Sequence, residues 1–145
     1  MTNDATPKTP AHLWVLGILS LLWGAAGAAN YVMVQLGAEA ATASMDERQR
    51  AFLEAYPAWL TASWALAVWT GLLATLFLLL RKALAAPLFG LAFVCMAITT
   101  VRNFVLEDGA EVLGSGGVTF AAVIFVVCLG QLLYARAMAA RGVLR

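Results

Sequence analysis

The sequence predicts an all-α integral membrane protein, folded as an antiparallel four-helix bundle with up-down-up-down topology and both termini cytoplasmic. Four uncharged stretches carry this prediction, at 13–38, 55–80, 83–101 and 112–135. A helix rises about 1.5 Å per residue, so each stretch can cross the ~30 Å hydrocarbon core of a bilayer. The 145-residue chain is also 63% hydrophobic and 12% charged, whereas a soluble domain has about 25% charged residues.

A single membrane domain over residues 1–145 follows from this pattern, because the chain is short for two domains. Its expected elements are spans at about 12–37, 57–80, 84–106 and 115–138, with a loop helix at about 45–56. Lys8 and the run Ala38-Glu39-Ala40 resemble the flanks of a signal peptide. The apolar run between them is far longer than the roughly 7–15 residues of such a peptide, so we expect a retained anchor.

A short amphipathic helix is predicted in the first outer loop, at about 45–56. Ser44 and Glu47 have the spacing of a capping box. One helical face carries Met45, Phe52, Leu53 and Tyr56. We expect this helix to lie on the outer membrane surface or to cap the bundle. Packing is the simpler interpretation, and a lid over a cavity is the alternative.

Small residues recur every four positions along the first two spans. They are Ser20, Gly24 and Ala28, followed by Ser63, Ala67, Gly71 and Thr75. Such ridges let helix backbones approach closely inside a bilayer. We therefore expect the first two spans to pack against each other or against another copy. Chance repetition in an alanine-rich sequence is the alternative.

Turn signals separate the later spans. The second span starts at Pro57, a favoured position in the first helical turn. Arg81 and Lys82 form a very short turn, which makes the second and third spans antiparallel neighbours. The glycine-rich run 114–117 is expected to precede the fourth span.

Positive charges predict the orientation in the membrane. One side holds Lys8, Arg81, Lys82, Arg136, Arg141 and Arg145, and the other holds Arg48, Arg50 and Arg102. The positive-inside rule then places both termini in the cytoplasm. Arginine outnumbers lysine and alanine is abundant, as in GC-rich bacterial genomes. We expect a multi-pass protein of the bacterial inner (plasma) membrane.

Several function classes are disfavoured by the residues that the spans contain. Cys95 and Cys128 lie near mid-span and form no CxxC pair, which argues against a disulfide oxidoreductase. The single His12 is too few for bis-histidine haem or a His-rich metal site. No carboxylate lies at mid-depth, so proton-coupled antiport by a central acid is disfavoured. We predict no cofactor and no metal, and no basic block indicates nucleic acid.

The candidate ligand-binding residues gather where the first and third spans end on the outer side. They are Asn30, Tyr31, Trp64, Arg102 and Asn103. Arg102 is predicted at the outer interface, where it either snorkels or pairs with Glu107, or contacts an anion or headgroup. Trp64 lies deeper. It either packs in the bundle core or lines an aromatic pocket for a lipid tail, quinone or other apolar ligand. No catalytic residues are predicted.

A family resemblance covers most of the chain. The segments 12–17, 23–31 and 56–59, followed by Trp69-Thr70-Gly71, resemble small uncharacterised four-span proteobacterial inner-membrane proteins, sometimes labelled "sugar transporter". In that family pattern an acid often stands at the position of Asn30 and a tyrosine at that of Arg102, so this chain departs at the candidate residues. The resemblance implies an inner-membrane location and a transporter-like role.

The functional prediction is a small, non-enzymatic integral membrane protein that binds a partner protein, a lipid or another apolar ligand. The alternative is a small transporter-like protein that moves an uncharged solute as an oligomer. An enzyme acting on a lipid or quinone has less support, because no acid–base pair lies within the bundle. The expected partners are the lipid bilayer and either further copies of the chain or a larger membrane complex.

Overall fold

The computed structural model describes residues 8–145, and within that range all regular structure is helical. The elements are α1 (Ala11–Gln35), α2 (Glu39–Thr42), α3 (Glu47–Glu54), α4 (Ala58–Leu79), α5 (Ala85–Val101), the π-helix η1 (Arg102–Leu106) and α6 (Gly109–Ala140). Four segments are long and apolar enough to cross a membrane: Ala11–Gln35, Ala58–Leu79, Ala85–Leu106 and Gly109–Ala140. The prediction of an all-helical chain with four apolar candidate spans is confirmed.

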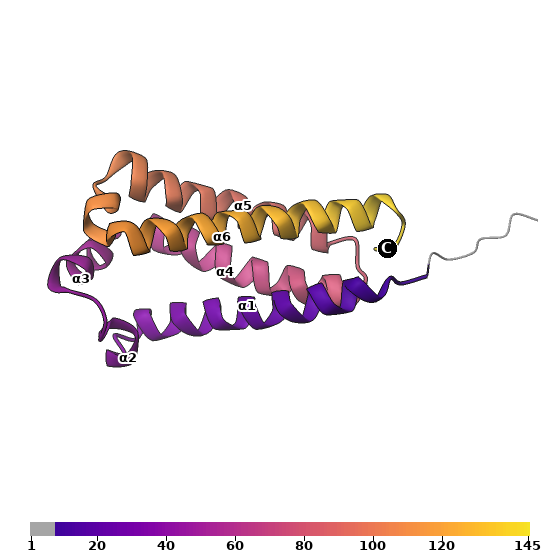
Figure 1. Ribbon diagram of the computed structural model, residues 1–145, viewed down its shortest axis with the longest axis horizontal. Coiled ribbons are helices and arrows are strands. Elements are labelled where there is room, and N and C mark those ends of the chain that lie inside the picture. Colours follow the sequence, from indigo (N-terminus) through magenta and orange to yellow (C-terminus); the bar gives the residue numbers. More distant parts are fainter. Residues whose placement is uncertain (1–7) are drawn as a thin grey trace, which may run out of the picture.

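The long helices pack in the order α1, α4, α5, α6. Helix α4 packs against α1 and α5, and α6 packs against α5 (Figure 1). Buried apolar residues gather where α4 turns into α5, and we call this the turn end. They are Leu13, Ala74, Leu78, Ala85, Phe89, Ala135, Met138, Val143 and Leu144. The opposite end carries α2, α3 and η1 and is called the α3 end (Figure 1).

Helices α1 and α4 pack together, but not through two facing small-residue ridges. On α1, Gly24 lies against Leu72, whose Cδ1 would be 3.3 Å from an added Cβ. The ridge on α4 instead faces α5: the Ser63 hydroxyl donates to the Cys95 carbonyl at 3.1 Å, and a Cβ on Gly71 would lie 3.7 Å from that of Ala92. The predicted packing of the first two spans against each other is confirmed, and leucines of α4 such as Leu72 lie beside α1.

The first loop holds α3, which corresponds to the expected helix at 45–56 but is shorter, and an additional short helix, α2. Asp46, and not Ser44, is the N-cap of α3. Its carboxylate accepts from the Gln49 backbone N–H at 2.8 Å, and the Gln49 side chain accepts from the Asp46 N–H at 3.3 Å. The capping box is therefore Asp46–Gln49, two residues later than Ser44–Glu47. Helix α3 ends before Pro57 because a residue that precedes proline disfavours helical angles.

Helix α6 begins at Gly109, well before the expected start near residue 115. The run 114–117 is not a loop, because only Gly114 leaves helical geometry, at φ 65° and ψ −173°. A positive φ is freely available to glycine, so Gly114 can turn the chain within the helix while its neighbours stay helical. The result is a kink within α6, close to the α3 end.

Candidate functional site

The site begins at the π-helix η1, which ends the third long helical segment. A π-turn contains one more residue per hydrogen-bonded ring than an α-turn, and such turns are frequent at functional sites. In η1, two consecutive residues, Arg102 and Asn103, line two different pockets. Asn103 lines a cavity between the helices, while Arg102 lines a separate shallow pocket beside Trp59 and Phe93.

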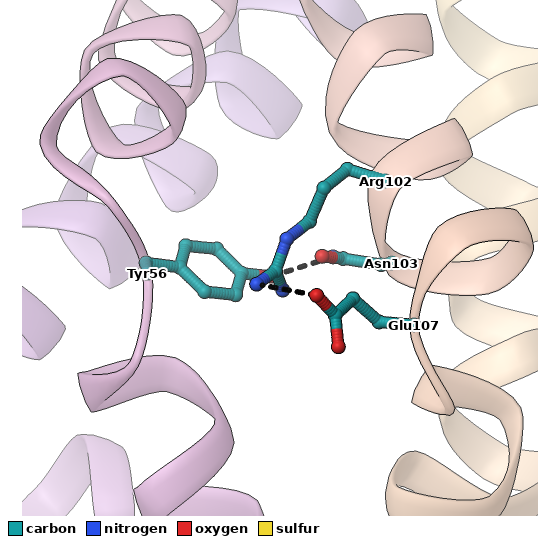
Figure 2. A network of polar contacts seen from close by, with 4 residues as sticks. All are labelled: Tyr56, Arg102, Asn103 and Glu107. Carbon is teal, nitrogen blue, oxygen red and sulfur yellow. Dashed lines mark hydrogen bonds and ion pairs between the residues drawn. The ribbon is translucent and has the colours of Figure 1, made fainter.

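Asn103 is joined to the segment between α3 and α4. Its Nδ2 donates to the Tyr56 hydroxyl at 2.5 Å (Figure 2). Asn103 is only 8% exposed, and its Oδ1 is buried without a hydrogen-bond partner. Burial raises the pKa of Tyr56 above its ordinary value, while the Asn103 hydrogen bond and the nearby Arg102 charge partly oppose this shift. Tyr56 is therefore a neutral phenol near pH 7.

The positive charge of Arg102 is paired with the Glu107 carboxylate and lies beside two aromatic rings. Its Nη2 lies 3.2 Å from Oε1 of Glu107 (Figure 2). The guanidinium carbon lies 5.6 Å from the Phe52 ring centre and 5.3 Å from that of Tyr56, within reach of cation–π attraction. The side chain is 13% exposed and Nη1 is buried without a partner. Of the readings that the sequence left open, pairing with Glu107 is the one observed.

An aromatic row connects α1 to α3. Tyr31 packs edge-on against Trp64 at a centroid distance of 5.0 Å. Trp64 lies 6.4 Å from Tyr56, which in turn lies 5.9 Å from Phe52. The row makes a continuous wall from the end of the first span to the loop helix, across the α3 end.

Four of the five candidate residues are connected through Tyr56 and Trp64, and the fifth, Asn30, shares the cavity wall with two of them. Tyr31 contacts Trp64, and Asn103 and Arg102 both contact Tyr56. Asn30 lines the cavity with Trp64 and Asn103. Sequence reasoning placed Tyr56 and Phe52 on the loop-helix face but missed them as site residues. The sequence pattern that could have indicated them is a pair of aromatic residues four positions apart, directly before Pro57.

The cavity has a volume of about 610 Å³ and is lined by α1, α4, α5, α6 and η1. Its walls are mainly apolar, with residues such as Gly27, Met96 and Phe120. Asn30 and Asn103 lie toward the α3 end and Gln131 lies further toward the turn end. From Gly117 to Gln131 the helical rise gives a length of roughly 20 Å. Cavities of this volume accommodate drug-sized ligands.

Helices α1 and α6 face each other across the cavity and contact each other at the turn end, while α3 contacts α6 at the opposite end. At the turn end, Nδ1 of His12 and the Tyr134 hydroxyl oxygen are 2.6 Å apart. At the α3 end, the Gln49 side chain of α3 donates to the Val112 carbonyl of α6 at 3.3 Å. An exposed ion pair, Arg48–Glu111, lies beside it at 3.8 Å. The His12–Tyr134 contact therefore joins the two helices that flank the cavity at the turn end. At the α3 end, the Gln49 hydrogen bond joins the loop helix α3 to α6.

Within residues 8–145 no group of His, Cys, Asp or Glu side chains is arranged to hold a metal ion. Cys95 and Cys128 are free thiols. Comparison of the chain with protein-family models, curated proteins and solved structures gives no match. The geometry of the cavity and its polar end is therefore the basis on which a function is proposed.

Proposed function

We propose that this chain is a multi-pass membrane protein that binds an apolar, lipid-like ligand in the cavity between α1 and α6. The observation that carries the proposal is the cavity itself: about 610 Å³, mainly apolar walls, and a few polar side chains, of which Asn30 and Asn103 lie toward the α3 end. Ligand pockets in proteins combine mostly apolar lining with a few placed polar groups. An apolar molecule would leave the bilayer for this cavity only if packing and polar contacts inside favoured it, since lipid tails already solvate apolar surface.

The charge distribution supports an orientation for this protein. With α1, α4, α5 and α6 as successive spans running up, down, up and down, Lys82 and Arg141 lie on the same side as Lys8. The resulting excess of basic residues at the turn end favours a cytoplasmic turn end and an inner-membrane location. The α3 end, with Asn103 and the aromatic row, then lies at the outer side. Labelling of single cysteines from either side of the membrane tests this orientation.

The cavity proposal is tested by filling the cavity. Gly27 lines it, and a Cβ added there meets no atom within 4 Å. Gly27→Leu is therefore expected to fill the cavity without disturbing α1. Gly130→Leu is the matched control, because Gly130 is an exposed α6 residue with equally open surroundings outside the cavity lining.

Native mass spectrometry of protein released from mild detergent is the measurement. We expect the wild type and Gly130→Leu to retain lipid-like masses, and Gly27→Leu to lose most of them. If the wild type carries no more bound lipid than Gly27→Leu, and takes up no added apolar ligand, the cavity does not bind one. Solute flux through vesicles containing the wild-type protein would instead favour the transporter-like alternative.

A further inference from the structure

We infer that the cavity takes an uncharged, single-chain lipid with a hydroxyl headgroup, and that this hydroxyl donates to Oδ1 of Asn103. The inference rests on the proposed function and specifies the chemistry of its ligand. Its starting point is a buried acceptor without a donor in the wall of an apolar cavity. A buried polar group without a hydrogen bond is unfavourable, and a ligand donor that reaches it restores the missing bond.

The two ends of the Asn103 amide are in different situations. The Nδ2 end donates to the Tyr56 hydroxyl at 2.5 Å, which holds the amide in place. The Oδ1 end is buried and unpaired, and the residue lines the cavity at its α3 end. Figure 2 shows the amide approaching Tyr56 from η1, with the Arg102–Glu107 pair beside it. A ligand group that pairs with this oxygen must be a hydrogen-bond donor.

The three threonine hydroxyls in the cavity wall do not supply that donor. The side chains of Thr75, Thr99 and Thr100 donate to carbonyls one turn earlier in their own helices, at 3.0, 3.1 and 3.0 Å. Their protons are therefore committed to the backbone. The acceptor at Asn103 stays open for a group that comes from outside the protein.

Charge in the cavity wall argues for a neutral ligand. The described residues that line the cavity include no Asp, Glu, Lys, Arg or His. Arg102 is adjacent in sequence but lines the other pocket and is paired with Glu107. A carboxylate or phosphate at Asn103 would bring acceptor against acceptor and leave its charge unmatched in an apolar wall. A hydroxyl can donate a hydrogen bond to this oxygen and brings no charge into the apolar wall.

The form of the cavity indicates a single chain. It extends roughly 20 Å along α6, from Gly117 to Gln131, which matches the length of an extended lipid chain. With the hydroxyl at Asn103, the chain would run past Trp23 and Met96 toward Gln131. The polar group then lies at the α3 end and the apolar tail points toward the turn end.

The test compares hexadecanol with hexadecyl methyl ether, in which a methyl group replaces the hydroxyl hydrogen and so removes the donor. Both are offered together to wild-type protein in mild detergent, and bound masses are measured by native mass spectrometry. Ratios from Gly27→Leu, whose cavity is filled, correct for unequal partitioning. We expect the alcohol to be favoured about ten-fold, as for one hydrogen bond to a buried acceptor.

Equal binding of the two ligands overturns the hydroxyl assignment and leaves the apolar cavity site intact. Absence of both ligands contradicts the proposed function as well. A double variant, Asn103→Leu with Tyr56→Phe, removes both partners of the internal bond, so no new buried group is left unpaired. It should bind both ligands equally, whereas Tyr56→Phe alone should keep the alcohol preference. If the double variant keeps that preference, the acceptor is not Asn103.

Discussion

Asn103 connects the packing at the α3 end with the cavity. One end of its amide holds the segment before α4, and the other end lies unpaired in the cavity wall. The same side chain therefore serves stability through Tyr56 and, in our proposal, recognition through Oδ1. These two roles can be separated, because they depend on different atoms of one amide.

Tyr56→Phe is expected to destabilise the fold, because it leaves the buried Nδ2 of Asn103 without its acceptor. The expected loss in the free energy of unfolding is about 1–2 kcal/mol. Thermal or denaturant unfolding in a fixed detergent measures it. The double variant Asn103→Leu with Tyr56→Phe should recover part of the loss, since neither partner is then left unpaired. A single variant as stable as the wild type would show that this hydrogen bond contributes little.

At the level of elements, the junction between η1 and α6 positions the site. A Cβ on Gly109 would overlap the backbone carbonyl oxygen of Asn103. The absence of a side chain thus lets the start of α6 lie directly against η1. This close approach keeps Asn103 and Arg102 in their places between α6 and the loop before α4.

Gly109→Ala is therefore expected to push η1 and α6 apart and to destabilise the protein by about 1–3 kcal/mol. Gly116→Ala is the control, because a Cβ there meets nothing within 4 Å. Removing a flexible glycine from a helix should make that control variant more stable by roughly 0.5–1 kcal/mol. Unfolding of both variants is compared with that of the wild type. If Gly109→Ala behaves like Gly116→Ala, the close approach does not limit the site.

At the scale of the whole molecule, orientation is the property that charge predicts most directly. In a background with both native cysteines replaced, Ser44→Cys should react with a membrane-impermeant maleimide added to spheroplasts. Lys82→Cys should react only after the membrane is permeabilised. Both positions are exposed, so accessibility within the fold does not limit either reaction. The reverse labelling pattern would place the α3 end in the cytoplasm.

The number and approximate extent of the long helices follow from composition and were predictable. Which side of each helix packs against which neighbour was not. Long apolar runs and Pro57 indicated the four long helices. These helices are apolar all round, so no amphipathic period distinguishes the packed face, and the sequence did not indicate that the ridge around Gly71 faces α5. The π-turn that begins at Arg102 and the kink at Gly114 interrupt apolar helical runs without a change in composition, so composition does not predict them. Tyr56 lies between helices, where periodicity does not indicate the direction of a side chain.

The helices that flank the cavity have a consequence for biogenesis. They are the first and the last of the four long helices, so α1 leaves the ribosome long before α6 does. An incomplete chain without α6 lacks one wall of the cavity, whereas α1, α4 and α5 can already pack in sequence order. Under the proposed function, ligand binding therefore requires that the last of the four long helices is in place.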